Sequence, residues 1–354
     1  MNLKTIIAGK GPNTVQGEQH PCGKISVVPV TSFEKLKACI ADWDRLLLEL
    51  PLPVPMLSYL WVLTALQYFL PGDEGWVCLM AYDDSILVGI LPLIIKRRNF
   101  GGMRRMGYRT PFNWHFLSID CLVKPGYEND VVPLMLKAAQ NLEPGYSELK
   151  LTRIENHSPV MEAIRNKVKG FRSVCRLNGF GSYIEVSGTY EKYLAGLDAK
   201  FVRNLRRLDR KMQSLNNLEM SVISENAGRD EYFERFLQVE GKSWKGKKGS
   251  AIIQMPALKK FYGDLTRRLG ERGWLEWYFF TTEGKTIAAM MTIRIGRKLV
   301  IYKIGYDENY SSYSPGNKLF EKMVQWAFAS GEIAEIDCLT AYPWNQNWNM
   351  TTRE

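Results

Sequence analysis

Apolar positions along the chain recur at two different spacings, and these spacings predict alternating strands and helices. Short apolar runs bounded by turn residues indicate strands, whereas apolar residues three and four positions apart indicate helices. The strands expected in the first half are 24–30, 76–82, 86–96, 116–123, 148–154 and a pair that ends at 186. The helices expected there are 31–50, 56–70, 129–142 and 159–168. The order is β-α-α-β-β-β-α-β-α-β, and the glycine-rich stretch 99–107 is expected to be a basic loop.

The second half repeats much of this order with a different sequence. The helices expected there are 189–215, 230–244, 256–270 and one that follows Ser314. The expected strands are 218–224, 275–282, 286–295, 299–307 and 334–339, of which the middle three form a meander with tight turns. The shared order predicts a duplicated mixed α/β domain whose sheets are antiparallel in their first part. We expect a tail at 1–23, one domain at 24–185 and another at 186–354.

The helix that follows this meander has an open first turn. Ser314 is a predicted N-cap, and Pro315 occupies the first helical position, where proline is tolerated best. Gly316, Asn317 and Lys318 fill the first turn, where backbone N–H groups lack intrahelical partners and the helix dipole is positive. Such a turn suits a phosphate or pyrophosphate. From spacing alone, an ordinary capped helix is the alternative.

Composition narrows the class of protein. The chain has 354 residues, of which 45% are apolar and 24% charged, so we expect a globular protein with two cores. No apolar run approaches the roughly 20 residues of a membrane-spanning helix, and we expect no signal peptide. Six cysteines occur without a CxxC pair, which argues against zinc and disulfides and fits a reducing cytoplasm. The net charge of +10 suits anionic partners such as nucleotides, acyl-CoA, nucleic acid or an anionic membrane face.

Two basic segments lie in the second half. The predicted helix 189–215 has one apolar stripe, and its other faces carry Lys200, Arg203, Arg206, Arg207, Arg210 and Lys211. These cations form either a solvated face or a surface for a polyanion. After Trp244 come Lys245, Lys247 and Lys248, in a loop that either closes over an anionic substrate or is simply solvated.

Four segments of the second half resemble a known family. They are FVRNLRRLDR at 201–210, EGKSWKGKKGS at 240–250, the element 306–310 followed by SPG at 314–316, and DCLTAYPWNQNW at 337–348. With the element order, they resemble the bacterial tandem-GNAT acyltransferases associated with cellulose and other extracellular-polysaccharide gene clusters, distant relatives of the Fem-type peptidyltransferases. The resemblance covers most of 180–350 and implies two similar domains of the GNAT fold. The first half resembles the family only in its general pattern.

The resemblance also implies a donor site. In GNAT proteins the helix after the fourth strand binds the pyrophosphate of acyl-CoA through backbone amides. That role falls here on Ser314, Gly316, Asn317 and Lys318. The donor is expected to be acetyl-CoA or another acyl-CoA, because SSYSPGNK replaces the usual glycine-containing pattern before the helix. The equivalent turn of the first half contains Glu128 and Asp130, whose carboxylates would repel a pyrophosphate, so we expect only the second half to bind CoA.

Acyl transfer to an amine needs a base, a dipole that stabilises the oxyanion and, in some enzymes, an acid for the leaving thiolate. All three histidines, His20, His115 and His157, lie in the first half. If the second half acts alone, its base would therefore be a carboxylate or an ordered water. Arrangements of serine or cysteine with histidine have no support in the spacing.

Four residues of the second half are candidates for the chemistry. They are Glu240, Asp307, Asp337 and Tyr342. Glu240 precedes the basic loop, and Asp307 ends the meander. Asp337 lies in the last strand, and Tyr342 follows that strand. Each also has a structural interpretation, as a loop cap or a packing aromatic. Tyr302 and Lys303 are adjacent in a meander strand, so we expect them on opposite faces of the sheet.

The leading interpretation is a cytoplasmic acyl-CoA-dependent N- or O-acyltransferase that uses no metal. Its acceptor would be a sugar nucleotide, a polysaccharide or lipid-linked precursor, or an amine metabolite. Peripheral contact with an anionic membrane or a polysaccharide-synthesis complex is compatible with the basic charge. The alternatives are a Fem-type aminoacyltransferase that uses charged tRNA and a catalytically inactive GNAT scaffold in a polysaccharide-synthesis assembly. A general nucleic-acid-binding protein is disfavoured, because the sequence has no helix-turn-helix, zinc-finger or RNP signature.

Overall fold

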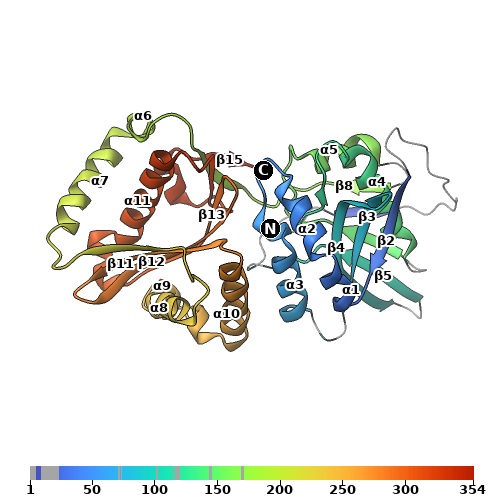
Figure 1. The fold of residues 1–354 in the computed structure, drawn as a ribbon, viewed down its shortest axis with the longest axis horizontal. Coiled ribbons are helices and arrows are strands. Elements are labelled where there is room, and N and C mark those ends of the chain that lie inside the picture. Colours follow the sequence, from blue (N-terminus) through green and yellow to red (C-terminus); the bar gives the residue numbers. More distant parts are fainter. Residues whose placement is uncertain are drawn as a thin grey trace. The chain divides into compact units, whose positions relative to one another are not determined.

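The computed structural model describes residues 5–8, 24–70, 72, 74–100, 103–113, 115, 120–142, 146–168 and 171–354 (Figure 1). These form two compact units: the first is Met1–Gly179 together with Glu354, and the second is Phe180–Arg353. The predicted tail 1–23 lies outside the described residues except for 5–8, which form a strand. No helix in the described ranges is long and apolar enough to cross a membrane.

The first unit contains a sheet and five described α-helices. Its described strands are β1 (Thr5–Ala8), β2 (Ile25–Val30), β3 (Gly75–Asp83), β4 (Ile86–Phe100), β5 (Met103–Arg109), β6 (Leu122–Val123), β7 (Tyr146–Lys150) and β8 (Phe171–Val174). Its helices are α1 (Phe33–Ala38), α2 (Ile40–Leu48), α3 (Tyr59–Tyr68), α4 (Glu128–Asn141) and α5 (Pro159–Lys167). The side chain of Ser32 accepts a hydrogen bond from Lys35 N, which fixes the predicted start of α1.

Two segments of the first unit differ from expectation. Of the stretch 99–107, predicted as a loop, residues 101 and 102 lie outside the described residues, and the rest belongs to the paired strands β4 and β5, whose ladder extends to Phe100 and Met103. Its glycines favour a loop locally, but cross-strand pairing overrides that preference. Of the predicted strand 116–123, residues 116–119 lie outside the described residues, and the described part forms only β6.

The second unit has its own sheet. Its strands are β9 (Gly181–Glu185), β10 (Glu219–Ile223), β11 (Leu275–Thr282), β12 (Lys285–Ile295), β13 (Lys298–Tyr306), β14 (Glu335–Asp337) and β15 (Thr351–Arg353). Its α-helices are α6 (Tyr190–Ala195), α7 (Ala199–Met212), α8 (Asp230–Gly241), α9 (Trp244–Lys247), α10 (Pro256–Glu271) and α11 (Pro315–Ser330). The short 3-10 helices η2 (Ile252–Gln254), η3 (Glu308–Tyr313) and η4 (Pro343–Trp348) connect them.

Apart from β6, which pairs with β4 in the first sheet, the two sheets have the same topology. The strand order is β2-β3-β4-β5-β7-β1-β8 in the first and β10-β11-β12-β13-β14-β9-β15 in the second. In each unit a helix follows the antiparallel strands and leads to a strand that is parallel to the last of them, β7 beside β5 and β14 beside β13. The N-terminal strand of each unit then pairs antiparallel with that strand. This confirms the predicted mixed α/β fold with two similar domains.

Two boundaries in the second unit were not apparent in the sequence. β9, which the sequence placed with the first domain, pairs with β14 and β15 and therefore belongs to the second sheet. The single helix expected at 189–215 is two helices, because the side chains of Thr189 and Asp198 each cap a separate start. The helical apolar spacing continues across the break and conceals it.

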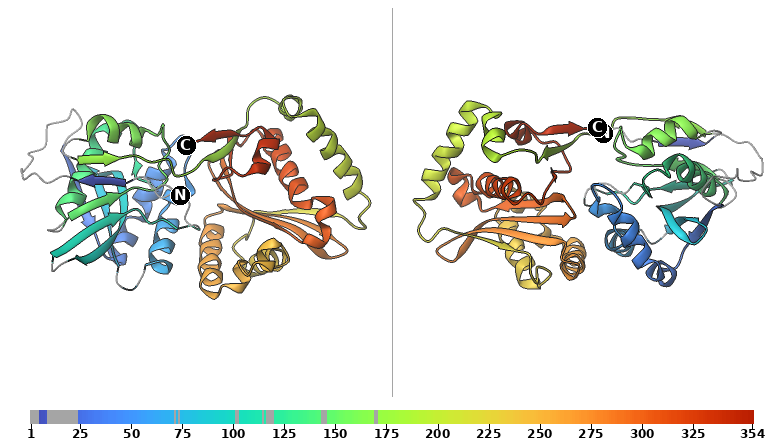
Figure 2. Two further views of the ribbon diagram at one scale, coloured as in Figure 1. Left: turned by 180° about the vertical axis from the view of Figure 1, so that it is seen from behind. Right: turned by 45° about the horizontal axis from the view of Figure 1, so that its top comes forward.

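Helices cover both faces of the second sheet (Figures 1 and 2). Tyr278 of β11 is buried in one cluster with Leu319 of α11. The neighbouring Trp277 packs against Phe236 of α8, with ring centroids 5.5 Å apart. Successive strand residues point to opposite faces, so α6, α7 and α11 cover one face and α8, α9 and α10 cover the other. We refer to these as the α11 face and the α8 face.

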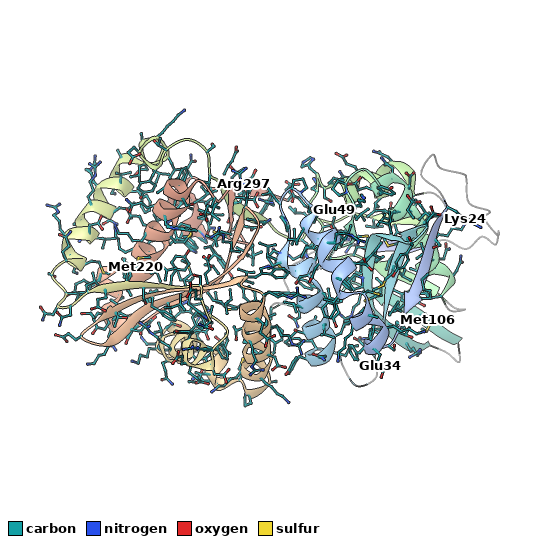
Figure 3. The ribbon with its side chains drawn as sticks, in the orientation of Figure 1. Lys24, Glu34, Glu49, Met106, Met220 and Arg297 are labelled. Carbon is teal, nitrogen blue, oxygen red and sulfur yellow. The ribbon has the colours of Figure 1, made fainter. Side chains whose placement is uncertain are left out.

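The turn between β12 and β13 fixes the start of β14. Arg297 lies in this turn (Figure 3). Its backbone oxygen accepts hydrogen bonds from Ala334 N at 2.7 Å and Glu335 N at 3.3 Å. These bonds set the parallel register in which Lys298 is opposite Glu335. These bonds therefore fix where the parallel pairing of β14 with β13 begins.

Candidate functional site

An extra residue in β13 interrupts the regular alternation of its side chains. Met291 of β12 is opposite Lys303, but the next residue, Thr292, is opposite Ile301. The register of β12 with β13 therefore skips Tyr302, which defines a β-bulge. The bulge brings Tyr302 and Lys303 to the same face, so the expectation of opposite faces is wrong. A bulge shifts the alternation by one residue and leaves no mark in the hydrophobic pattern.

Both of these side chains approach Tyr262 of α10 on the α8 face. The hydroxyl oxygens of Tyr302 and Tyr262 are 3.4 Å apart. Lys303 Nζ lies 4.9 Å from the ring centroid of Tyr302 and 5.4 Å from that of Tyr262. Burial raises the pKa of both phenols well above its usual range, so both remain protonated at neutral pH.

The second sheet opens next to this bulge. The parallel pairing of β13 with β14 ends at Val300 and Asp337, although β13 continues to Tyr306. After Asp337 the chain follows β9, since Cys338 N donates to Ser182 O at 2.8 Å. In the described part of the chain, one edge of 301–306 therefore has no strand beside it. Its backbone polar groups can bind a ligand.

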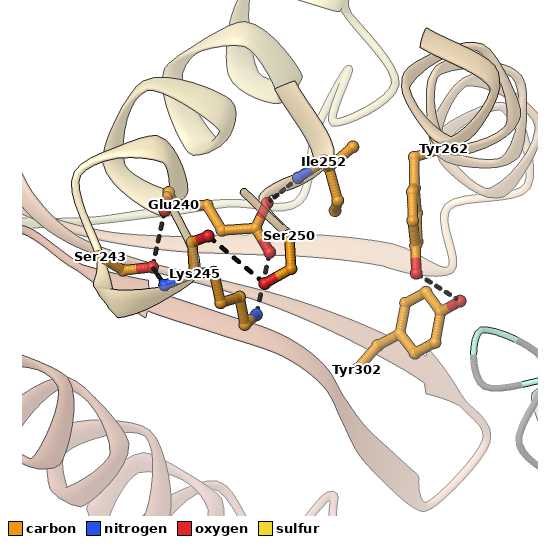
Figure 4. A network of polar contacts seen from close by, with 7 residues as sticks. All are labelled: Glu240, Ser243, Lys245, Ser250, Ile252, Tyr262 and Tyr302. Atoms are coloured by element: carbon orange, nitrogen blue, oxygen red, sulfur yellow. Dashed lines mark hydrogen bonds and ion pairs between the residues drawn. The ribbon is translucent and has the colours of Figure 1, made fainter. Parts of the chain in front are cut away.

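Glu240, near the end of α8, is the centre of a buried polar network (Figure 4). Glu240 is 1% exposed. Oε1 accepts a hydrogen bond from Lys245 Nζ at 2.9 Å, and Oε2 accepts one from Ile252 N at 2.8 Å. Ser243 Oγ donates to the backbone oxygen of Glu240 at 2.6 Å. Through its bonds to Lys245 and Ile252, the carboxylate thus holds the segment 242–252 against α8.

Lys303 lies beside this network on the same face. Gly305 packs so closely on α8 that a Cβ there would be 3.3 Å from Glu240 Cα, a tight contact that α8 would have to shift slightly to accept. The pKa of the Lys303 amine is lowered to about 7, chiefly because burial disfavours its charged form. The Lys245 ammonium lowers this pKa as well, whereas Glu240 opposes the shift. Lys303 was not among the candidate residues, and its one sequence signal is a lysine within an apolar strand.

Asp307 has the geometry of a cap. It is the N-cap of η3, and its Oδ1 accepts a hydrogen bond from Asn309 N at 3.0 Å. Its other oxygen lies 3.6 Å from Lys242 Nζ. Asp307 is 5% exposed and lies one residue beyond β13, at the end of the strand nearest to α11.

Asp337 belongs to a different cluster of charges. Lys298 Nζ lies 2.8 Å from Asp337 Oδ2 and 2.9 Å from Glu335 Oε1. Arg353 also pairs with Glu335, at 2.6 Å. These ion pairs join β15 to β13 and β14 in the region where β13 and β14 are still paired. The structure therefore separates Asp337 from Asp307 along the length of β13.

Tyr342 lies on the surface and is 58% exposed. It occupies the N-cap of η4, where its backbone N–H donates to Asn345 Oδ1 at 3.1 Å. Of the four candidates for the chemistry, Glu240 and Asp307 lie on elements that meet at the C-terminal part of β13. Asp337 and Tyr342 lie elsewhere in the unit.

The start of α11 has the predicted proline but not the predicted side-chain cap. Ser314 occupies the N-cap position with φ of 50°, and its side chain makes no capping hydrogen bond. Pro315 is the first helical residue. A Cβ at Gly316 would lie 3.2 Å from the Tyr306 ring, which places this first turn against the end of β13. Asn317 Oδ1 accepts a hydrogen bond from Trp348 Nε1 at 3.4 Å.

Lys318 is buried and paired rather than free. It is 1% exposed, and its Nζ lies 2.6 Å from Asp209 Oδ1 and forms a second ion pair with Glu321. Tyr190 donates a hydrogen bond to Glu321 at 3.3 Å. The ammonium therefore joins α6, α7 and α11, and its charge is already compensated by two carboxylates.

The basic loop that follows Glu240 is ordered by its own hydrogen bonds. Residues 244–247 form α9, capped by Ser243, and Gln254 Nε2 donates to Gly246 O at 3.0 Å. Lys247 forms an ion pair with Glu308 at the start of η3. Trp244 is 48% exposed, with Lys248 Nζ 5.2 Å from its ring centroid. The loop thus presents an aromatic side chain next to the Glu240 network.

No metal centre is evident in the described ranges. There, no group of three or more histidine, cysteine, aspartate or glutamate side chains is arranged to hold a metal ion. The groups that the fold does bring together are Glu240, Lys245, Tyr262, Tyr302 and Lys303, on the α8 face beside the opening of the sheet. This set contains a carboxylate, two amines and two protonated phenols, and it lies beside the free backbone edge of 301–306.

Comparisons with known proteins identify the fold of this arrangement. Residues 199–346 match the family model described as acetyltransferase (GNAT) domain. A search of curated proteins found no match. Among solved structures, the chain is similar to FemX, with 10% identity, a TM-score of 0.61, and coverage of 89% of this chain and 93% of that chain.

Two further structures have the same fold. One is the C-terminal DUF2156 domain of a putative lysylphosphatidylglycerol synthetase from Agrobacterium fabrum, with 9% identity, a TM-score of 0.55 and 90% coverage of both chains. The other is a tandem GNAT protein from the clavulanic acid biosynthesis pathway, with 14% identity, a TM-score of 0.50, and coverage of 93% of this chain and 96% of that chain. At these identities the similarity extends to the fold, and the predicted tandem arrangement is confirmed.

Proposed function

We propose that the GNAT acetyltransferase domain, which makes the chain an acyltransferase, moves an acetyl or other acyl group from acyl-CoA to an amine or hydroxyl group. The observation that carries the proposal is the open edge of β13, located between the start of α11 and the polar side chains of the α8 face. A thioester laid along this edge would meet backbone N–H groups that can stabilise an oxyanion.

The donor pyrophosphate is assigned to the first turn of α11. The backbone N–H groups of Gly316 and Asn317 lie in the part of a helix that lacks intrahelical acceptors, and the helix dipole favours anions there. Ser314 positions this turn through its left-handed backbone. Lys318 is given a structural role in the proposal, because two carboxylates already surround its ammonium. In the first unit, Glu128 and Asp130 lie in the first turn of α4, which supports donor binding by the second unit alone.

Asn317→Asp should weaken acyl-CoA binding without disturbing the fold. The change is isosteric, keeps the oxygen that accepts from Trp348 and places a negative charge beside the pyrophosphate. A hundredfold excess of acetyl-CoA over its Kd should stabilise the wild-type protein by about 2.7 kcal/mol in thermal denaturation. In the variant, Kd should rise at least about tenfold, or about 1.4 kcal/mol.

Gln325→Glu is the matched control, an amide-to-acid change on the exposed side of the same helix. It should leave acetyl-CoA binding unchanged. If the wild type and Asn317→Asp bind acetyl-CoA equally well, the pyrophosphate does not bind at the first turn of α11. If acetyl-CoA does not stabilise the wild type at all, the inactive-scaffold interpretation is favoured instead.

The acceptor in this proposal is an amine or hydroxyl of a sugar, a polysaccharide precursor or a small metabolite. The exposed Trp244 beside the Glu240 network supports a sugar, because an indole face can pack against a ring. The resemblance of four sequence segments to the polysaccharide-associated branch also supports a sugar acceptor. A cytoplasmic location is part of the proposal and rests on the scattered cysteines and on the donor.

One surface favours a second candidate function, aminoacyl transfer from charged tRNA. The exposed side of α7 carries Lys200, Arg203, Arg206, Arg207 and Arg210. The acid within this helix is Asp209, which is paired with Lys318. Arg203, Arg206 and Arg210 form no ion pair with any residue in the described ranges, so their charge is available to a polyanion.

If α7 binds tRNA, Arg203→Glu/Arg206→Glu/Arg210→Glu should abolish the binding of bulk tRNA, measured by filter retention at low salt. Wild-type affinity should fall steeply with salt, with a log–log slope of about −3.5 for five single-strand phosphate contacts. Lys260→Glu/Lys285→Glu/Lys322→Glu makes the same change in net charge at other exposed positions of the unit and should retain binding. Absence of wild-type binding at about 50 mM salt would exclude this candidate.

A further inference from the structure

Lys303 places its amine among aromatic side chains, an arrangement that packing alone does not explain. It extends from the bulge of β13 toward α10, with its Nζ near the rings of Tyr302 and Tyr262. In the ranges that the structure describes, its amine forms no ion pair. Residue 303 is partly exposed and does not belong to the buried core.

The charged and titratable groups that face Lys303 come from each element packed on this part of β13. α8 contributes Glu240, α9 contributes Lys245, and α10 contributes Tyr262, while Tyr302 is its neighbour in the bulge. Glu240 and Lys245 are themselves paired at 2.9 Å, so they oppose each other at Lys303. Desolvation is therefore the largest influence on the pKa of Lys303, and the amine is mostly neutral just above pH 7. A neutral amine has a lone pair and can accept a proton.

We propose that Lys303 is the general base of the transfer, taking the proton of the acceptor as the new bond forms. This inference rests on the proposed function. It differs from the expectation of a carboxylate base, because both oxygens of Glu240 already accept hydrogen bonds. Glu240 and Lys245 are then positioning residues that set the protonation of Lys303.

The step balances in atoms and charge. The acceptor nitrogen attacks the thioester carbonyl carbon, the C–N bond forms, and Lys303 Nζ takes the proton that this nitrogen loses. The C–S bond then breaks and CoA leaves as a thiolate. A thiol has a pKa of about 8.5, so the Lys303 ammonium is the stronger acid and can pass the same proton to the sulfur. For a hydroxyl acceptor, the proton comes from the O–H group.

The protonation of Lys303 can be measured directly by competitive labelling with trace acetic anhydride, followed by mass spectrometry of the peptide. The labelling midpoint of Lys303 should lie near pH 7, well below the value of about 10.4 for a free lysine amine. Glu240→Gln should lower the Lys303 midpoint and Lys245→Met should raise it, because the first removes an anion and the second a cation. An ordinary midpoint for Lys303 would overturn the inference.

Activity gives the second measurement, as CoA release from acetyl-CoA with glucosamine as the amine. The wild-type rate should rise with pH through about 7, and Lys303→Met should lower kcat about a hundredfold and abolish this limb. Acetyl-CoA should stabilise Lys303→Met as much as the wild type, which shows that the variant is folded. A variant with the wild-type rate and pH profile would overturn the inference. Failure of acetyl-CoA to bind the wild type would instead contradict the proposed function and leave the labelling result to decide the state of Lys303.

Discussion

Lys318→Met should lower the free energy of unfolding by about 3 kcal/mol, which is typical of removing one partner from a buried ion pair. The methionine keeps the length and most of the packing of the side chain. It leaves Glu321 buried without its cation and removes the pairing of Asp209 on α7 with α11. Because Asp209 is partly exposed and retains water, the loss should be at the low end of the range for buried pairs. Urea denaturation of the wild type and the variant measures it.

The matched control is Lys322→Met, which removes an exposed lysine from the same helix and should change stability by less than about 0.5 kcal/mol. Lys318→Met/Glu321→Leu should recover part of the loss, because both charges are then absent. Acetyl-CoA affinity should change little in Lys318→Met. A large loss of affinity with unchanged stability would show that Lys318 serves the donor and not the helices.

Glu240→Ala should both destabilise the second unit by about 3 kcal/mol and release the segment 243–252. The substitution leaves Ile252 N without its acceptor and Lys245 without its partner inside the unit. Hydrogen exchange of residues 243–252 should become faster, while α11 should keep its protection. Activity should fall as well, since the same segment carries Trp244 and Lys245 beside Lys303.

Glu231→Gln provides the comparison for this variant, because it removes an exposed carboxylate from the same helix. It should alter neither stability nor exchange by a measurable amount. Glu240→Gln retains the shape of the side chain and should have an intermediate effect. Normal exchange of 243–252 in Glu240→Ala would mean that this segment is held by other contacts.

The elements of the fold were largely predictable from the sequence, because they follow from local patterns. The three strands at 275–306 alternate strongly and are separated by tight turns, and their bounds agree with the prediction to within a residue or so. The break between α6 and α7 and the assignment of β9 depend on caps and pairings that an apolar pattern does not record. The pairing of β4 with β5 was not predicted, because the glycines in this part of the sequence dominate the local pattern.

The site was less predictable, because its geometry depends on single-residue shifts and on partners distant in sequence. Glu240 was identified as a candidate, but its two partners, Lys245 and Ile252, become clear only when the segment folds back on α8. Lys318 had the spacing of a phosphate ligand, and its burial by Asp209 could not be foreseen. Lys303 was overlooked since the bulge at Tyr302 is invisible in the sequence.

A crystal structure of the protein with acetyl-CoA tests most directly whether the opening of the second sheet is a donor site. We expect pyrophosphate oxygens at about 2.7–3.2 Å from the backbone nitrogens of Gly316 and Asn317. The pantetheine arm should lie along the free edge of 301–306 and bring the thioester to the side of Lys303. A CoA molecule bound elsewhere, such as at α4 of the first unit, with the edge of β13 empty, would contradict the proposed function.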